Sequence, residues 1–255
     1  MASMKNSSLH GRVALITGAS RGLGRAIALS LGSAGASIAL VARDMEALRA
    51  VSDQVRNTGA EAAIFQADVT DEHQVRRLEQ EALSRLGHVD ILVNNAGINI
   101  RKPLEEYSLD EWDKVLSTNL TGVFLVCRSF IPQMKGRGYG RIINLTSTMS
   151  HVSLPGRAAY SASKAGLIGL TKALALELAP EGITVVAISP GPFATEMNTL
   201  LIEDADLNRQ FVSRIPIGRW GVPEEVGQLA RFLCSPEAGF ITGTDILIDG
   251  GWTAQ

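Results

Sequence analysis

A tyrosine and a lysine stand four residues apart, at Tyr160 and Lys164, within a stretch whose composition predicts a long helix over 158–179. Residues at positions i and i+4 of a helix lie on one face, so we expect these side chains to be neighbours. A phenol with a pKa of about 10 is a poor base near neutrality, but a nearby ammonium group favours the phenolate and lowers that pKa. Such a pair could pass a proton to or from an alcohol oxygen.

A serine lies thirteen residues before the tyrosine, at Ser147, just past an apolar run over 141–145. The run predicts a buried strand, which places the serine at a carboxyl end of the predicted sheet. Its hydroxyl could hydrogen-bond the reacting oxygen. The three side chains together therefore predict acid–base chemistry on an alcohol or a carbonyl.

A glycine-rich turn follows the first predicted strand, over 13–17, and opens a predicted helix. Its pattern is G-x-x-x-G-x-G, in which glycine lets the backbone turn tightly and approach a phosphate closely. The free N–H groups and the positive dipole end of the helix favour an anion. The turn predicts a dinucleotide site made by Gly18, Ser20, Arg21, Gly22, Leu23 and Gly24.

The same turn also spells G-x-S-x-G around Ser20, the nucleophile elbow of α/β-hydrolases. A hydrolase of that type needs an acid and then a histidine after the serine, and an oxyanion loop from an earlier strand. Only one predicted strand precedes Ser20, and the last histidine of the chain is His151. These facts disfavour a hydrolase. The four histidines and the two cysteines are scattered, so no metal site is expected.

Short apolar runs alternate with amphipathic stretches along the whole chain, which predicts βαβ units and a parallel sheet. We expect a single doubly wound α/β domain over 11–255, with helices on both faces of the sheet, after a loose tail over 1–10. The irregular segment 190–222 follows the end of a strand, where such sheets bind ligands, and is a candidate lid. The expected strands are 13–17, 37–42, 63–66, 90–94, 141–145, 183–188 and 245–248. The expected helices are 23–33, 44–58, 71–86, 112–134, 158–179 and 223–233.

The overall composition excludes several classes of protein. The net charge is −2, from 24 basic and 26 acidic residues, so the chain lacks the basic excess of nucleic-acid-binding proteins. Two cysteines, Cys127 and Cys234, cannot form a disulfide framework and favour a reducing compartment. No stretch resembles a signal peptide or an apolar membrane span, so a cytoplasmic protein without a membrane partner is expected.

The order and spacing of these motifs resemble the short-chain dehydrogenase/reductase family from about Gly11 to Trp252. The motifs are Thr17–Gly24, Asp68-Val69, Asn94–Gly97, Asn119, Ser147, Tyr160-x-x-x-Lys164 and Pro190-Gly191. The resemblance implies a Rossmann fold with strand order 3-2-1-4-5-6-7. It also implies a carbonyl reductase or alcohol dehydrogenase that transfers a hydride with a nicotinamide cofactor, and a homotetramer. Apolar and small residues on the predicted helices over 121–134 and 159–178 agree with burial between subunits.

The resemblance also implies roles for individual residues. Tyr160 would be the general acid/base, Lys164 would lower its pKa and bind the nicotinamide ribose, and Ser147 would hold the substrate oxygen. Asn119 would position a proton relay through water; the alternative is an amide that bonds backbone within a helix. Further cofactor contacts are implied for Asp68, Val69, Asn95, Ala96, Gly97, Pro190, Gly191 and Thr195, beside Tyr160 and Lys164.

The cofactor preference is argued from the end of the second predicted strand. Enzymes of this kind that bind NAD usually carry an acid there, but this chain has Ala42, followed by Arg43. Arg43 and Arg21 could hold a 2′-phosphate that an acid would repel. Asp44 lies near the spacing expected for a ribose-binding acid, and we interpret it as the N-cap of the next helix. The expectation is NADP(H), with NAD(H) possible.

Two subgroups compete for the substrate. The stretch 95–106 is similar to gluconate 5-dehydrogenases, and Arg101 or Lys102 could bind the carboxylate of a sugar acid. The alternative is a 3-oxoacyl-[acyl-carrier-protein] reductase, but Glu181 stands where such enzymes often have a basic residue. Ser147, His151 and Met197 complete the candidate substrate site. A third hypothesis, a non-catalytic dinucleotide sensor, is disfavoured because such proteins typically lose the tyrosine or the lysine. The physiological substrate, its stereochemistry and the direction stay open.

Overall fold

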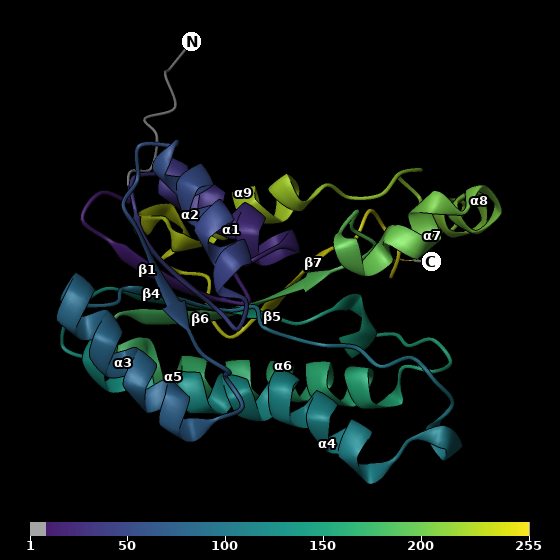
Figure 1. Ribbon diagram of the computed structural model, residues 1–255, viewed down its shortest axis with the longest axis horizontal. Helices are drawn as coiled ribbons and strands as arrows, with labels where there is room; N and C mark the ends of the chain where they lie inside the picture. The colour runs from purple at the N-terminus through teal and green to yellow at the C-terminus, as the bar shows by residue number, and fades with distance from the viewer. Residues whose placement is uncertain (1–8, 255) are drawn as a thin grey trace.

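The computed structural model describes residues 9–254, which are built around one seven-stranded parallel sheet (Figure 1). The order of the strands is β3-β2-β1-β4-β5-β6-β7, as the resemblance to the dehydrogenase/reductase family implied. The strands are β1 (Val13–Thr17), β2 (Ser37–Ala42), β3 (Ala62–Gln66), β4 (Ile91–Asn94), β5 (Gly140–Leu145), β6 (Ile183–Pro190) and β7 (Asp245–Ile248).

The central strands are buried and mainly apolar because both of their faces are covered. All five residues of β1 and all eight residues of β6 are buried. Alternate residues of β1 belong to two separate cores: Ala14 and Ile16 to one, and Val13 and Leu15 to the other. Continuous apolar runs are typical of parallel strands that carry helices on both sides.

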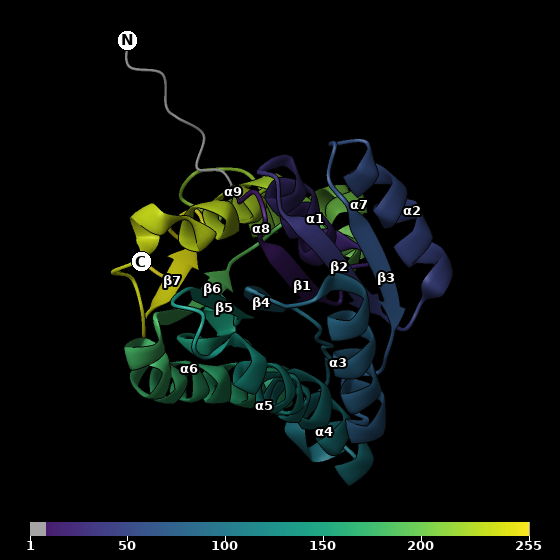
Figure 2. The same cartoon turned by 90° about the vertical axis from the view of Figure 1, so that its left-hand side faces the viewer.

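Helices cover both faces of the sheet (Figure 2). One face carries α1 (Gly22–Ser33), α2 (Met45–Arg56) and α9 (Pro223–Cys234). The other carries α3 (Glu72–Leu86), α4 (Leu109–Leu116), α5 (Gly122–Met134) and α6 (Ala158–Leu178). Two short helices, α7 (Thr199–Glu203) and α8 (Ala205–Val212), project beyond the carboxyl end of the sheet. They lie within the segment expected to form a lid.

Local capping explains where two helices begin. Asp44 caps α2, because its Oδ1 accepts a 3.0 Å hydrogen bond from the N–H of Ala47, as predicted. The helix expected from residue 112 begins earlier, at Leu109, because Ser108 and Glu111 form a reciprocal capping box. This helix continues through a π-helical turn, η2 (Ser117–Thr121), into α5.

The continuous helical segment Leu109–Met134 is long and apolar enough to cross a membrane by length and composition, contrary to the expectation from the sequence. It has 26 residues, and the mean hydropathy of its most apolar window is 1.3. This is weak evidence for a membrane span, since 44% of that window is buried inside the structure and core helices pass the same test.

The predicted tail over 1–10 falls mostly outside the described residues. Its last two residues are not loose. Leu9 is buried, and its N–H donates a 2.7 Å hydrogen bond to the carbonyl of Ala34. The ring of His10 lies against Gly35.

Candidate active site

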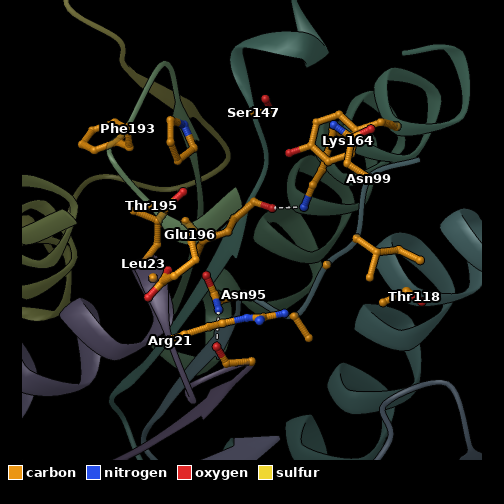
Figure 3. Close-up of a pocket in the computed structure, with 18 of the residues that line it drawn as sticks. Arg21, Leu23, Asn95, Asn99, Thr118, Ser147, Lys164, Phe193, Thr195 and Glu196 are labelled. Carbon is orange, nitrogen blue, oxygen red and sulfur yellow. Dashed lines mark hydrogen bonds between the residues drawn. The ribbon is translucent and has the colours of Figure 1, made fainter. Parts of the chain in front are cut away.

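A cavity of about 720 Å³ opens along the carboxyl ends of the strands (Figure 3). Its walls come from the loops after β1, β2, β3, β4, β5 and β6, and from the lid segment. Ligands of open α/β sheets bind at this edge. Sixteen of the seventeen residues expected to bind the cofactor line the cavity; Gly24 is the exception.

Close approaches of the backbone shape the glycine-rich turn. Gly18 has φ +63°, and a Cβ there would lie 2.8 Å from the Cα of Ala96. A Cβ on Gly24 would lie 2.4 Å from the carbonyl oxygen of Gly18 and 2.4 Å from Asn95 Nδ2. The amide of Asn95 ties the turn in place, because its Nδ2 donates 3.0 Å hydrogen bonds to the carbonyls of Thr17 and Gly18. Gly24 therefore serves the packing of the turn.

The start of α1 has backbone N–H groups to offer a ligand. Within residues 9–254, no side chain caps this helix, and its first turn contains no acidic residue, although Glu196 Oε2 of the lid segment lies 3.4 Å from a Cβ position on Gly22. The N–H groups at a helix start need partners and favour an anion. The cradle of glycines and the uncapped helix next to a large cavity fit the diphosphate of a dinucleotide.

The opposite end of the cavity from Tyr160 carries charged side chains at the ends of β2 and β3. Arg43 Nη1 lies 3.5 Å from Asp68 Oδ2 in a partly exposed ion pair. Partial burial alone would raise the pKa of Asp68, but hydrogen bonds from Thr70 and the charge of Arg43 hold it below its ordinary value. Asp68 is therefore a carboxylate at neutral pH, in a position to accept hydrogen bonds from an adenine.

Ser147 and Tyr160 meet at the catalytic end of the cavity. Ser147 precedes the one-turn helix η3 (Thr148–Ser150), and its Oγ accepts a 3.1 Å hydrogen bond from the N–H of Met149. Burial raises the pKa of the Tyr160 phenol, whereas a hydrogen bond with Ser147 and the charges of Arg157 and Arg101 lower it. The effect of burial is the larger, so the pKa of Tyr160 lies above its ordinary value and the phenol is protonated at neutral pH without a bound ligand.

Lys164 lies beside the Tyr160 ring and is anchored to the end of β5. Its Nζ lies 5.8 Å from the centre of the Tyr160 ring and donates a 2.6 Å hydrogen bond to the carbonyl of Leu145 (Figure 3). Burial lowers the pKa of Lys164 to about 8. The charges of Arg157 and Arg101 act to lower the pKa of the Tyr160 phenol.

Asn119 lies buried in η2 and does not line the cavity. Its Oδ1 accepts from the N–H of Ile98 at 2.8 Å, and its Nδ2 donates to the Ile98 carbonyl at 2.9 Å and to Ser163 Oγ at 3.0 Å. The alternative of a bond within its own helix is therefore wrong, because the side chain bonds the backbone of a different loop. A Cβ on Gly97 would lie 3.3 Å from Asn119 Oδ1 and 3.5 Å from Lys164 Nζ, so the three residues converge.

Comparison with known proteins identifies the family. A family model described as "Enoyl-(Acyl carrier protein) reductase" matches residues 18–253. A 3-oxoacyl-[acyl-carrier-protein] reductase, FabG, of Aquifex aeolicus is 40% identical over 244 residues, covering 95% of this chain and 98% of the relative. The chain belongs to the short-chain dehydrogenase/reductase family.

Two gluconate 5-dehydrogenases are similar to a comparable degree. That of Gluconobacter oxydans is 39% identical over 248 residues and 97% of both chains. A crystal structure of the Burkholderia cenocepacia protein in complex with NADP and tartrate has a TM-score of 0.93, with 38% identity and 98% coverage of both chains. As a short-chain dehydrogenase/reductase, this protein is an oxidoreductase that interconverts a ketone and a secondary alcohol by hydride transfer with a nicotinamide cofactor.

Only some of the candidate substrate residues of this dehydrogenase/reductase line the cavity. Arg101 and Ser147 line the cavity, but Lys102 and His151 are not among the lining residues. Lys102 Nζ lies 2.5 Å from Glu111 Oε2, and His151 Nε2 lies 2.6 Å from Asp245 Oδ2. The side chain of Met197 lies outside the part of the structure that is described.

The contact between His151 and Asp245 belongs to a polar network behind Ser147. The Asp245 carboxylate also accepts hydrogen bonds from Ser189 Oγ at 2.7 Å and from Thr146 Oγ1 at 3.1 Å. Ser189 Oγ lies 3.0 Å from the carbonyl oxygen of Ser147. The network therefore joins the ends of β5 and β6 to the start of β7 and supports the loop that carries Ser147.

Several residues that line the dehydrogenase/reductase cavity were not predicted from the sequence. Arg157 and Asn99 line the catalytic end, and Phe211 and Trp252 form an aromatic wall with ring centres 5.0 Å apart. None of these residues stands in a spacing that signals chemistry. Among residues 9–254, no group of three or more His, Cys, Asp or Glu side chains could hold a metal ion.

Proposed function

We propose that this oxidoreductase prefers NADP(H) and acts on a sugar acid of the keto-gluconate type. The observation that carries the proposal is the placement of Arg101. Its guanidinium lines the catalytic end of the cavity, and its partner there is the neutral Oδ1 of Asn198 at 3.3 Å. A guanidinium without an acidic partner suits the carboxylate of a substrate.

The catalytic roles follow from the positions of the side chains. Ser147 and Tyr160 hydrogen-bond the substrate oxygen, and Tyr160 donates its proton when a ketone is reduced and accepts one when an alcohol is oxidised. Lys164 binds the ribose of the nicotinamide, and Asn119 positions the water-mediated relay that returns the proton. The bound cofactor supplies or accepts the hydride.

The preference for NADP(H) rests on charge at the end of β2. Arg21 and Arg43 both line the cavity, and Ala42 stands where an acid would accept from ribose hydroxyls. Asp44 is engaged as the cap of α2. Two guanidiniums stabilise a 2′-phosphate, and the dehydrogenase neighbour from Burkholderia cenocepacia is described in complex with NADP.

The second candidate is a 3-oxoacyl-[acyl-carrier-protein] reductase, which is favoured by the identity of 40% to the Aquifex aeolicus relative. The group next to the ketone of such a substrate is a neutral thioester, which gives no partner to Arg101. The carboxylate of Glu181 accepts a 3.1 Å hydrogen bond from the N–H of Gly136, so an acid occupies the position expected to be basic. We therefore place the sugar acid first. A sensor without catalysis is third, because Tyr160 and Lys164 are both present.

The remaining proposals concern the chain as a whole. We propose one domain over 11–255 with a lid over 190–222, a homotetramer, and a location in the cytoplasm. Large apolar side chains exposed on α5, α6, α9 and β7 support burial between subunits. They are Phe124, Leu176, Phe232 and Leu247, with Phe240 in the loop before β7. Both cysteines are free and buried, which agrees with a reducing compartment.

A substrate panel measured with both cofactors tests the function. We expect the highest kcat/KM for a 2-keto or 5-keto sugar acid with NADPH. The highest kcat/KM for an acetoacetyl thioester would favour the acyl-carrier reductase instead. Tight cofactor binding without turnover of any ketone or alcohol would favour the sensor.

A further inference from the structure

Arg157 is a partly buried cation at the catalytic end of the cavity. It immediately precedes α6, three residues before Tyr160, and lines the cavity. Within the described part of the chain, its guanidinium makes no hydrogen bond and no ion pair. A guanidinium carries five N–H donors, so a half-buried one without protein partners leaves those donors available to a ligand in the cavity.

A second cation, Arg101, lines the same cavity. The charge of Arg101 acts on Arg157, and both charges act on the phenol of Tyr160. The two arginines come from different loops, after β4 and before α6, and like charges repel each other. An anion bound between them would offset this repulsion.

Three acidic side chains line the cavity, and in the described part of the chain none of them forms an ion pair with either arginine. Asp44 and Asp68 lie at the ends of β2 and β3, where the cofactor adenosine is expected. Glu196 lies over the glycine-rich turn, its Oε2 3.4 Å from a Cβ position on Gly22 (Figure 3). A carboxylate of the substrate is therefore the anion that we expect between the two arginines.

We propose that Arg157 and Arg101 together form the subsite for the substrate's carboxylate. This inference rests on the proposed function, and it adds Arg157 as the specificity-determining residue. The charges of both arginines lower the pKa of the Tyr160 phenol, so both lie near it. The phenol must contact the reacting oxygen. A carboxylate bound by the two arginines therefore lies within a few carbons of the carbonyl. A planar guanidinium matches a carboxylate with two parallel hydrogen bonds.

Asn99 indicates what the substrate carries besides its carboxylate. It lines the same end of the cavity, and its Oδ1 is buried without a hydrogen-bond partner among the described residues. A buried acceptor is stabilised by a donor. The amide therefore adds a polar group to this end of the cavity, which suits an oxo acid that also carries hydroxyl groups.

The test compares the best oxo acid of the panel with its carboxamide, which has the same shape without the charge. We expect wild-type kcat/KM to favour the acid by about 100-fold or more. Arg157→Gln should lower kcat/KM for the acid by about 100-fold, mainly through KM, and change that for the amide by less than about threefold. Arg157→Lys should restore part of the preference for the acid, because lysine keeps the positive charge but lacks the paired N–H donors of the planar guanidinium.

Two measurements keep the result interpretable. Lys114→Gln removes an exposed positive charge on α4 that does not line the cavity, and it should leave the preference for the acid unchanged. NADPH affinity, followed by fluorescence, should be the same in Arg157→Gln as in the wild type, which shows that the site is folded.

The outcomes separate the two proposals. A wild-type enzyme that does not distinguish the acid from the amide would contradict the proposed sugar-acid function. A wild-type preference that survives in Arg157→Gln would overturn the role of Arg157 and leave the proposed function standing. Loss of turnover for the amide as well would assign Arg157 to catalysis in general, which also overturns the inference.

Discussion

The ammonium group of Lys164 donates a 2.6 Å hydrogen bond to the main-chain carbonyl of Leu145, the last residue of β5. The contact links the first turns of α6 to the strand that leads into Ser147. Among residues 9–254 no carboxylate forms an ion pair with Lys164, and its burial lowers its pKa to about 8. A buried charge without an ionic partner destabilises a fold, so this lysine is kept at the expense of stability.

We predict that Lys164→Met abolishes turnover but stabilises the protein at pH 7. A shift of the lysine pKa from 10.5 to about 8 corresponds to a destabilisation of about 3 kcal/mol, which the substitution removes. The substitution also leaves the carbonyl of Leu145 without its hydrogen bond, which lowers the free energy of unfolding by about 1–2 kcal/mol. The net gain in the free energy of unfolding should be about 1–2 kcal/mol, measured by urea denaturation.

The stability difference between Lys164→Met and the wild type should depend on pH. The pKa of Lys164 is lower in the folded protein than in the unfolded chain. The charged lysine therefore lowers the free energy of unfolding by its full amount below pH 8, and this destabilisation decreases as the pH rises toward 10.5. The advantage of Lys164→Met should therefore shrink between pH 8 and pH 10. A variant that is less stable than the wild type at pH 7 would contradict the prediction.

Tyr160→Phe should lower kcat by about 10³-fold, because it removes the proton donor and keeps the ring. Cofactor affinity, measured by NADPH fluorescence, should change by less than about threefold. Tyr139→Phe is the matched control, since the Tyr139 hydroxyl bonds the carbonyl of Cys234 and does not line the cavity. Substantial activity in Tyr160→Phe would show that another group moves the proton.

Arg43→Ala should raise KM for NADPH by about tenfold and leave KM for NADH within about twofold, because only NADPH carries a 2′-phosphate. The control is Arg49→Ala, an exposed arginine on α2 outside the cavity. If Arg43→Ala weakened both cofactors equally, the arginine would be serving the fold through its ion pair with Asp68 instead.

Gly24→Ala should weaken binding of both cofactors by about tenfold or more and lower stability by about 1–3 kcal/mol. The added Cβ would lie 2.4 Å from the carbonyl oxygen of Gly18, a main-chain atom that cannot rotate away. Ser33→Ala, at the exposed end of the same helix, should change stability by about 0.5 kcal/mol or less. Fluorescence titration and thermal unfolding measure the two effects, and equal behaviour of the variants would refute the packing role of Gly24.

Local patterns determined much of this protein. The apolar runs that became β1 and β6, the glycine spacing of the turn after β1, and the four-residue spacing of Tyr160 and Lys164 are properties of neighbouring residues. Strand and helix periods and the reach of a phosphate-binding turn act over a few residues, so the sequence alone carried them. Asp44 as the cap of α2 belongs to the same class, because capping is a contact across three residues.

The tertiary structure decided which side chains meet. Arg101 and Lys102 are adjacent and equally basic, yet one lines the cavity and the other pairs with Glu111. Arg157 carried no signal until the fold placed it on the wall of the same cavity as Arg101, and Lys164 hydrogen-bonds the carbonyl of Leu145 at the end of β5. Such contacts join residues of different elements or loops, and they are set by how these elements pack against one another, for which no local spacing gives a rule.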